Sequence, residues 1–238
     1  MVENNTMTYP KEILSYKHEY IRFFIKRFPF DVFSILMRPH LERKRYNYIL
    51  KEMSEVVGVF NVLKNLINKN KTDKFVLYEL MSGDALFSHF VAKNFPNSKV
   101  VAIDLKFSEE YKSNNKSKFF DNIFFIEKNI LEIKDLEKAD FIVSIHACNN
   151  LSEIVIDKAS EFSNFFILVP CCIGSENYEK WKRNNEIANK FFNAINNEYY
   201  KWCFYLAEYA KSKNFHINLK VDNKMLTERN LIIFGKKI

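Results

Sequence analysis

Residues 75–85, which read FVLYELMSGDA, decide the fold, because they lead from a buried strand through a glycine turn into a helix. The run 75–80 is apolar almost throughout, which predicts a strand that is covered on both faces. Gly83 lets the backbone turn and approach a ligand closely, which a side chain would obstruct. In an open α/β sheet such a turn lies at the carboxyl end of a strand, where ligands bind.

Short apolar runs alternate with helical segments along the rest of the chain. This alternation predicts a parallel, doubly wound sheet with helices on both faces, and the last two runs, joined by a turn at Asn223-Lys224, predict an antiparallel pair. The sequence therefore predicts an α/β protein with a seven-stranded, Rossmann-like sheet. Strands are expected at 75–80, 100–103, 123–126, 141–145, 165–169, 216–221 and 231–234, helices at 85–95, 107–117, 151–162 and 176–211, and a shorter turn near 134–138.

A helical extension precedes the sheet. Apolar residues recur at three- and four-residue steps through residues 10–70, with an interruption at Pro29, so we expect a basic extension over residues 1–70 before a domain over residues 71–238. Of the net charge of +7, residues 1–74 carry +6, from 14 Lys and Arg against 8 Asp and Glu. This excess predicts a polyanionic partner, RNA before a membrane, although a solvated helical face would have the same composition.

The chain has only 4 Gly and 4 Cys. So few glycines exclude a glycine-rich phosphate cradle. The cysteines show no secreted-type disulfide framework, and the sequence opens without a charged-then-apolar leader or an apolar run of about 18 residues. We therefore expect a cytoplasmic protein with reduced thiols, no membrane partner and no disulfide between the neighbours Cys171 and Cys172.

The ends of the second and third strands carry residues that suit a nucleoside. Asp104 follows the second strand about 20 residues after the glycine turn, where a carboxylate can accept both hydroxyls of a ribose or, alternatively, cap the next helix. Asn129 and Ile130 follow the third strand, where they could bind and cover an adenine ring or simply make a turn. The missing second glycine disfavours a dinucleotide and favours S-adenosylmethionine, which has no phosphate.

Titratable residues follow the fourth and fifth strands and are expected to converge on one cleft. His146 could act as a base or orient a substrate hydroxyl. Cys171 or Cys172 could line the pocket, act as a nucleophile, join His146 in a metal site, or only pack. Because the two cysteines are contiguous and lack the two-residue gap of structural zinc sites, the sequence favours no metal.

Several of these segments resemble one branch of the class I S-adenosylmethionine-dependent methyltransferases. ELMSGDALFS at 79–88 resembles the first motif E-L-C-A-G-K-G-x-L-S, His146-Ala147-Cys148 resembles H-x-C-G, and Pro170-Cys171-Cys172 resembles P-C-C. Arg43-Lys44-Arg45-Tyr46 resembles a basic segment before that domain, and Thr227-Glu228-Arg229-Asn230 resembles an S-x-K-N turn before the last strand. The branch includes the tRNA ribose 2′-O-methyltransferases of the acceptor-stem type and the methyltransferase-like proteins related to them.

The resemblance implies a seven-stranded methyltransferase fold with S-adenosylmethionine as cofactor and RNA as substrate, tRNA before rRNA. The alternatives are a protein or small-molecule acceptor, or a catalytically silent binding subunit. By similarity, His146 and Cys171 face the transferred methyl group, and Arg43, Lys44 and Arg45 bind the RNA. The residues expected to bind the cofactor are Glu79, Met81, Gly83, Asp104, Leu105, Asn129, Ile130 and His146.

The chain departs from the branch at positions where the shape of the backbone matters. Met81 stands where the branch has Cys or a small residue, Ala85 replaces Gly, and Asn149 replaces Gly or Asp. The Cβ of Ala85 restricts the φ angles that are open to the backbone. The first motif therefore keeps one glycine, Gly83.

Overall fold

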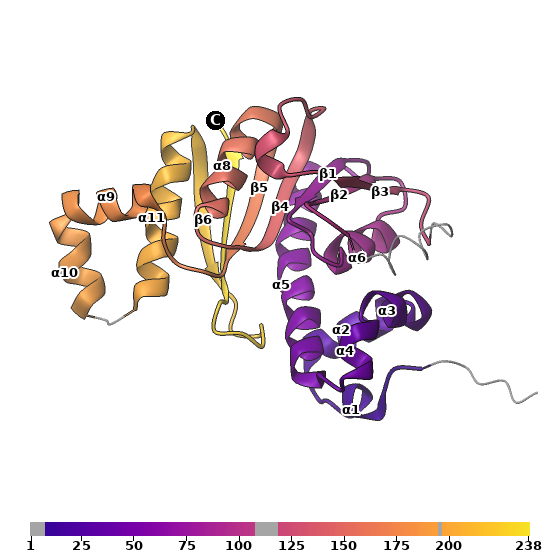
Figure 1. Ribbon diagram of the computed structural model, residues 1–238. Coiled ribbons are helices and arrows are strands. Elements are labelled where there is room, and N and C mark those ends of the chain that lie inside the picture. Colours follow the sequence, from indigo (N-terminus) through magenta and orange to yellow (C-terminus); the bar gives the residue numbers. More distant parts are fainter. Residues whose placement is uncertain (1–7, 108–118, 195–196) are drawn as a thin grey trace, which may run out of the picture.

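The computed structural model describes residues 8–107, 119–194 and 197–238, and its centre is one seven-stranded sheet (Figure 1). The strand order is β3-β2-β1-β4-β5-β7-β6. The first five strands are parallel, and β7 pairs antiparallel with β5 and β6, which confirms the predicted doubly wound sheet with a closing hairpin. The strands are β1 (Val76–Leu80), β2 (Lys99–Asp104), β3 (Ile123–Glu127), β4 (Ala139–Ala147), β5 (Ser163–Pro170), β6 (Phe215–Val221) and β7 (Leu231–Lys237).

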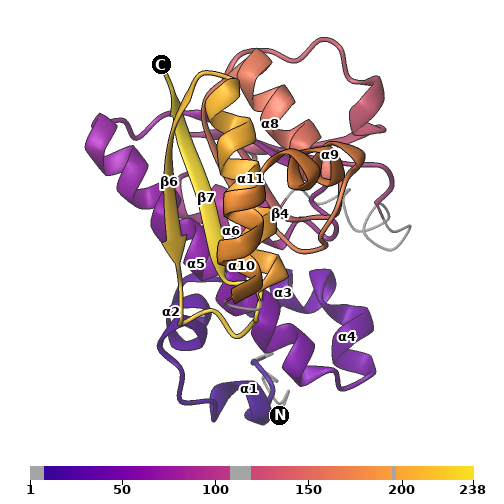
Figure 2. The ribbon, with the colours of Figure 1, turned by 90° about the vertical axis from the view of Figure 1, so that its left-hand side faces the viewer.

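Helices cover both faces of the sheet. α5 and α6 lie on one face, and α8 and α11 lie on the other (Figures 1 and 2). The short helices α1 to α4 gather around one end of α5 (Figure 1). None of the described helices is long and apolar enough to cross a membrane. The helices are α1 (Lys11–Leu14), α2 (Glu19–Arg27), α3 (Phe30–Leu36), α4 (Arg38–Glu42), α5 (Tyr46–Asn70), α6 (Leu86–Asn94), η1 (Ile130–Glu132), α8 (Leu151–Phe162), α9 (Glu176–Asn184), α10 (Glu186–Ala194) and α11 (Glu198–Ser212).

Residues along each strand alternate between two hydrophobic cores, one on each face of the sheet. In β1, Leu77 packs into the core that contains α5 and α6, whereas Tyr78 and Leu80 pack into the core that contains α8 and α11. In β4, Phe141 and Ile142 divide in the same way. Burial on both sides is the reason why these strands are apolar almost throughout.

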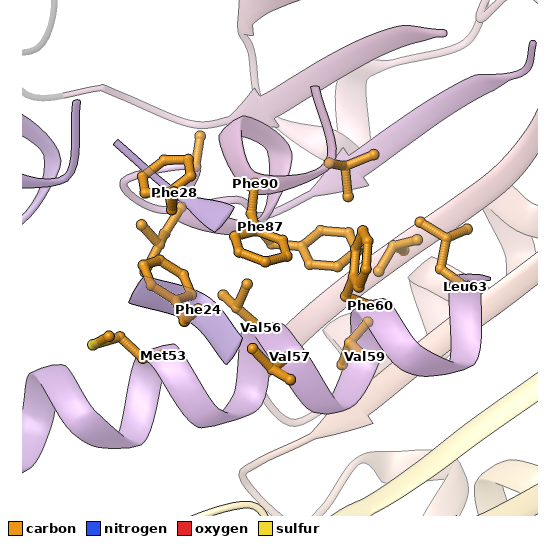
Figure 3. Close-up of a cluster of buried hydrophobic side chains, with 14 of the residues drawn as sticks. Phe24, Phe28, Met53, Val56, Val57, Val59, Phe60, Leu63, Phe87 and Phe90 are labelled. Carbon is orange, nitrogen blue, oxygen red and sulfur yellow. The ribbon is translucent and has the colours of Figure 1, made fainter. Parts of the chain in front are cut away.

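The helix α5 joins the amino-terminal helices to the sheet (Figure 3). It is 25 residues long, and its apolar face, which includes Val56 and Phe60, packs against Phe24 of α2 and Phe90 of α6. The ring of Phe90 stacks on Phe24 at 4.9 Å and meets Phe60 edge-on at 5.0 Å. Aromatic pairs of these geometries add about 0.5–1.5 kcal/mol each beyond the burial of their surface. This packing fixes where α5 lies relative to the strand ends.

The helical stretch expected over 176–211 is divided into three helices. α9 ends before Asn185, and α11 begins after Asn197, whose side-chain oxygen accepts a hydrogen bond from the backbone N–H of Tyr200 at 3.0 Å. Asparagine side chains compete for backbone hydrogen bonds and so interrupt helices. The apolar periodicity continues across these boundaries, so the sequence pattern predicted one helix in place of three.

The structure bears differently on the helix expected at 107–117 and on the turn expected near 134–138. The helix expected at 107–117 lies outside the described residues except for Phe107, which is not helical. The turn expected near 134–138 lies earlier, at η1, because the side chain of Asn129 accepts a hydrogen bond from the backbone N–H of Leu131 at 3.0 Å. The seven strands lie within three residues of the expected boundaries.

A buried carboxylate ties α2 to the loop between β6 and β7. Asp222 is 3 % exposed, and its Oδ2 accepts hydrogen bonds from the hydroxyl of Tyr20 and from Nζ of Lys220, each at 2.8 Å. Burial alone would raise the pKa of Asp222, but the bonds from Lys220 and Tyr20 outweigh it and lower the pKa below its ordinary value. The same loop reaches α5, where the N–H of Leu226 donates to Oγ of Ser54 at 2.8 Å.

Tyr20→Phe is expected to destabilise the protein by about 1.5–3 kcal/mol, because it removes a hydrogen bond to a buried charged group. In a chain of this length the loss corresponds to a decrease in Tm of roughly 3–12 °C, measured by scanning calorimetry. The exposed Tyr16 provides the control, since Tyr16→Phe removes the same hydroxyl without unpairing a buried carboxylate. Equal Tm values for the two variants would contradict this account of Asp222.

Candidate active site

Hydrogen bonds between the ends of β1 and β2 hold the turn that follows β1. The backbone N–H of Gly83 donates to Oδ2 of Asp104 at 2.8 Å, and that of Ser82 donates to the carbonyl of Ile103 at 3.1 Å. Gly83 has a φ of 53°, and a Cβ added there would meet no atom within 4 Å. The turn therefore presents bare backbone to open space, as close approach by a ligand requires.

Three residues near the turn and at the end of β4 adopt the left-handed conformation that glycine adopts most easily. Their φ angles are 56° at Met81, 53° at Ala85 and 50° at Asn149. In the branch that the sequence resembles, these three positions hold Cys or a small residue, Gly, and Gly or Asp, respectively. The chain thus keeps a glycine-like backbone although each residue carries a side chain, at a cost of about 1–2 kcal/mol per residue. Strain of this kind is found mainly at functional sites, where the surroundings hold it in place.

Two buried titratable residues brace α6 against the turn. Oε2 of Glu79 accepts hydrogen bonds from the backbone N–H of Ser88 at 2.9 Å and from its hydroxyl at 2.6 Å. Nδ1 of His89 lies 2.8 Å from the carbonyl oxygen of Ala85. Burial raises the pKa of Glu79 to about 8 and lowers the pKa of His89 to about 4, so both are uncharged at neutral pH without a ligand.

A pocket of about 440 Å³ lies between the ends of β1 and β4 and the helix α5. Met81 lines the wall of this pocket and does not close it. The volume is in the range of small-molecule sites, roughly 300–1,000 Å³. The lining residues are Met37, Tyr48, Glu52, Glu55, Val56, Glu79, Met81, Ser82, Gly83, Asp84, Leu86, Phe87, Lys106, Ile145 and His146.

The pocket carries an excess of carboxyl groups. Among the described residues, Glu52, Glu55, Glu79 and Asp84 line it, against the single permanent cation Lys106. Burial raises the pKa of Glu52 and of Asp84, in the same direction as that of Glu79. A cation that enters the pocket would stabilise the ionised forms of these acids. The pocket therefore fits a small ligand that carries positive charge.

His146 enters the pocket from the end of β4, where the pairing with β5 shifts register and His146 itself has a φ of 69°. Its Nε2 lies 2.7 Å from Oε2 of Glu55, whose side chain is 1 % exposed. Nζ of Lys51 lies 3.7 Å from the other oxygen of Glu55. A carboxylate at this distance fixes the orientation of the imidazole, and the other ring nitrogen, Nδ1, takes no part in this contact. The imidazole is thus held in place by a buried carboxylate.

The sequence did not predict the contribution of α5 to this pocket. Tyr48, Glu52 and Glu55 all come from that helix. Acidic side chains are rarely buried without a partner. Glu52 and Glu55 lie three residues apart at the edge of the apolar face of α5. This pair of acids is the feature of the sequence that could have indicated a functional role for the helix.

Four of the residues expected to bind a cofactor lie together on the pocket, namely Glu79, Met81, Gly83 and His146. Asp104 does not line the pocket itself, but its carboxylate accepts a hydrogen bond from the backbone N–H of Gly83, which does. The remaining three follow the ends of β2 and β3 and do not line the pocket. Leu105 is 68 % exposed, Asn129 caps η1, and Ile130 is 6 % exposed in a hydrophobic core.

Cys171 lies outside the pocket, in a group of thiols. Its Sγ is 2.7 Å from Sγ of Cys148, and all four cysteines are free. Burial and the neighbouring thiols raise the pKa of Cys171, so it is a neutral thiol at pH 7. Two groups of side chains place potential metal-ligand atoms within 4.8 Å of one another: Cys148, Cys171 and Cys172 form one, and Glu52, Glu55 and His146 form the other.

The basic segment lies beside the pocket. Arg43, Lys44 and Arg45 are exposed in the turn between α4 and α5. Lys44 and Arg45 line a surface depression together with Tyr48, which also lines the pocket. The guanidinium of Arg45 lies 5.0 Å from the centroid of the Tyr48 ring, and His40 stacks on the same ring at 4.2 Å.

The sheet order and a ligand pocket at the carboxyl ends of its parallel strands define a Rossmann-like methyltransferase fold. Residues 51–175, just over half of the chain, match the model of a family described as a methyltransferase domain. The chain belongs to this methyltransferase family. It is an S-adenosylmethionine-dependent methyltransferase.

Solved structures are similar to this chain at low sequence identity. The ribosomal protein L11 methylase from Lactobacillus delbrueckii subsp. bulgaricus is 13% identical, with a TM-score of 0.49 over 79% of each chain. The Methanococcus jannaschii fibrillarin pre-rRNA processing protein is 15% identical, with a TM-score of 0.47 over 70% of this chain and 67% of its own. Magnesium protoporphyrin IX methyltransferase from Synechocystis PCC 6803 is 10% identical, with a TM-score of 0.49 over 78% and 84%. No curated protein matches the sequence.

The residues of the pocket fit S-adenosylmethionine. This cofactor carries a sulfonium and an ammonium group, which suit a pocket lined by four acids. Oγ of Ser82 and Oε1 of Glu55 are buried on the pocket and have no hydrogen-bond partner among the described residues. Buried polar atoms are almost always bonded, so Oγ of Ser82 is available to a ligand, and so is Oε1 of Glu55 beside its ion pair with Lys51 at 3.7 Å.

Glu79→Gln is expected to stabilise the ligand-free protein more at pH 8 than at pH 5. The pKa of Glu79 is about 8 in the folded protein, against 4.5 in the unfolded chain. As the pH rises from 4.5 to 8, the unfolded chain ionises at Glu79 while the folded protein keeps the proton. The wild type therefore loses stability over this pH range. Glutamine does not ionise and keeps an oxygen for Ser88. The gain in Tm should be larger at pH 8 by at least ~3 °C, a change of about 1 kcal/mol. A gain that does not depend on pH would contradict this interpretation.

Proposed function

We propose that this enzyme methylates RNA, with tRNA as the first candidate and rRNA as the second. The observation that carries the proposal is the distribution of charge around the pocket. The pocket itself is acidic and suits a cationic cofactor, while its neighbouring surface is basic and suits a polyanion. One side chain, Tyr48, lines both.

A second basic surface lies between α2 and the loop that connects β6 and β7. It is a groove of about 780 Å³, in which the cations among the described residues outnumber the one acid, Glu19. Phosphate contacts along a nucleic-acid backbone need several cations spread over a surface, which this groove and the depression at Lys44 and Arg45 together provide. The basic residues of the groove are Lys17, Arg22, Lys26, Arg27 and Lys224.

The cofactor-binding part of the proposal follows the strand ends. Oδ2 of Asp104 accepts from Gly83, and Oδ1 accepts only a long bond, 3.4 Å, from the N–H of Lys106, so Oδ1 would keep a lone pair for a ribose hydroxyl. The exposed side chain of Leu105 would be covered by the adenosine portion. Asn129 uses its amide oxygen to cap η1, so its Nδ2 would donate to the adenine edge, with Ile130 beneath. Glu79, Met81 and Gly83 would enclose the methionine portion.

His146 is the proposed catalytic residue. The cofactor supplies an electrophilic methyl group on its sulfonium, so the task of the protein is to align the acceptor and to remove its proton. Nδ1 of His146 would accept that proton, and Glu55, a positioning residue, would stabilise the imidazolium through Nε2. Cys171 remains a candidate through its contact with the His146 carbonyl, 3.4 Å from its Sγ.

Removing two cations beside the pocket is expected to weaken RNA binding. Lys44→Ala combined with Arg45→Ala should lower the affinity for a tRNA pool roughly tenfold and reduce the slope of log Kobs against log salt by about 1.4–1.8, the share of two phosphate contacts. Lys64→Ala combined with Lys69→Ala is the matched control, because it removes two exposed charges at the other end of α5. Filter binding at several salt concentrations measures both. Equal losses in the two double variants, or an affinity for RNA that does not change with salt, would refute RNA as the substrate.

Glu55→Gln is expected to reduce methyl transfer by about 10²-fold or more while cofactor affinity changes little. A glutamine amide can donate to Nε2 and so favours the tautomer in which Nδ1 is already protonated. Transfer of tritiated methyl groups to the tRNA pool measures kcat, and calorimetry with S-adenosylhomocysteine measures cofactor affinity. His146→Ala should have a similar effect on kcat, and the double variant should be no slower than either single one. A decrease in cofactor affinity with kcat unchanged would exclude the proposed base.

A further inference from the structure

Three cysteine thiols meet beyond the ends of β4 and β5, outside the pocket described above. Sγ of Cys171 lies 2.7 Å from Sγ of Cys148 and 3.6 Å from Sγ of Cys172. All three sulfurs lie within 4.8 Å of one another. We propose that these three residues, as thiolates, bind one zinc-type divalent cation, at a site that does not depend on which acceptor the enzyme methylates.

The spacing of the sulfurs suits a tetrahedral metal. Ligand sulfurs at a Zn–S distance of about 2.3 Å lie roughly 3.8 Å apart. Cys171 and Cys172 are already at this separation, and Cys148 would need to move by roughly 1 Å, which rotation about its side-chain bond allows. At 2.7 Å, Cys148 and Cys171 lie outside the length of a disulfide, ~2.05 Å, and inside ordinary packing distance, roughly 3.5–4.0 Å.

Hydrogen bonding within the protein does not account for the cluster. The thiols of Cys148 and Cys171 both point to the carbonyl oxygen of His146, at 3.5 Å and 3.4 Å. Two weak donors that share one acceptor gain little from lying together. A cation that replaces their protons would bind both sulfurs directly.

The backbone is bent to bring the cysteines together. The register of β4 against β5 shifts between Ile145 and Ala147, and both His146 and Asn149 have positive φ angles, 69° and 50°. The N–H of Asn149 then donates to the carbonyl of Cys172 at 3.3 Å, which joins the two strand ends. In the left-handed region the Cβ of each residue lies too close to the backbone, which destabilises the loop. A metal that links the two loops would offset that cost.

The donor set indicates which cation fits. Thiolates bind Zn²⁺ in preference to the hard ions Mg²⁺ and Ca²⁺. The imidazole of His146 is bonded to Glu55 on the pocket side, so only its carbonyl faces the cysteines. Cys172 is exposed to solvent, which leaves the fourth position open to water or a substrate atom. Three protein ligands with one open position is the arrangement of a reactive zinc site.

Metal analysis of the full-length protein tests the proposal. The wild type, expressed with zinc and passed through gel filtration after tag removal, should retain one zinc per chain by mass spectrometry. Replacement with Co²⁺ should give a thiolate-to-cobalt charge-transfer band and the strong visible bands of tetrahedral cobalt. Cys172→Ser, at an exposed position that does not disturb packing, should weaken zinc binding at least tenfold, and Cys148→Ser should abolish the charge-transfer band.

Cys203→Ala is the matched control, because Cys203 is buried in α11 and its sulfur belongs to no metal-ligand group among the described residues. This variant should bind zinc as the wild type does. A zinc affinity equal in the wild type and Cys172→Ser would overturn the proposal. So would two titratable thiols, in place of four, in the unreduced protein denatured with a chelator, since Cys148 and Cys171 would then form a disulfide.

Discussion

The hydrogen bond between Glu55 and His146 is the contact on which the site depends, because it joins α5 to the end of β4 across 91 residues of sequence. Glu55 is buried there by the packing of α5 against Phe24 and Phe90, on the face of the sheet that α6 also covers. A buried carboxylate is costly unless it is paired, so the imidazole and the carboxylate hold each other in place. The position of the proposed base is therefore set by the core.

The same packing separates two kinds of charge. Acids from α5 and from the β1 turn gather inside the pocket, and basic residues of the turn before α5 remain outside it. A cationic cofactor and a polyanionic substrate would thus be attracted to adjacent places without competing for one. The backbone at Met81, Ala85 and Asn149 stays in the left-handed conformation of glycine, so the strand ends keep their shape despite the substitutions.

Much of this fold could be predicted from the sequence, because strands buried on both faces are continuous apolar runs and Gly83 marks the turn. Neither Glu55 nor the meeting of Cys148 with Cys171 could be predicted in this way. The first depends on how a helix far upstream crosses the strand ends, and the second on a register shift inside β4, and neither has a local signal. The divided helices at 176–211 show the same limit, because side-chain caps at Asn185 and Asn197 override periodicity.

A crystal structure of the enzyme with S-adenosylhomocysteine tests the central claim most directly. The account predicts ribose hydroxyls on Asp104, the amino group among the acids of the pocket, and the thioether sulfur directed toward His146. It would be contradicted by a ligand bound elsewhere on the molecule, or by one bound with its sulfur directed away from the Glu55–His146 pair.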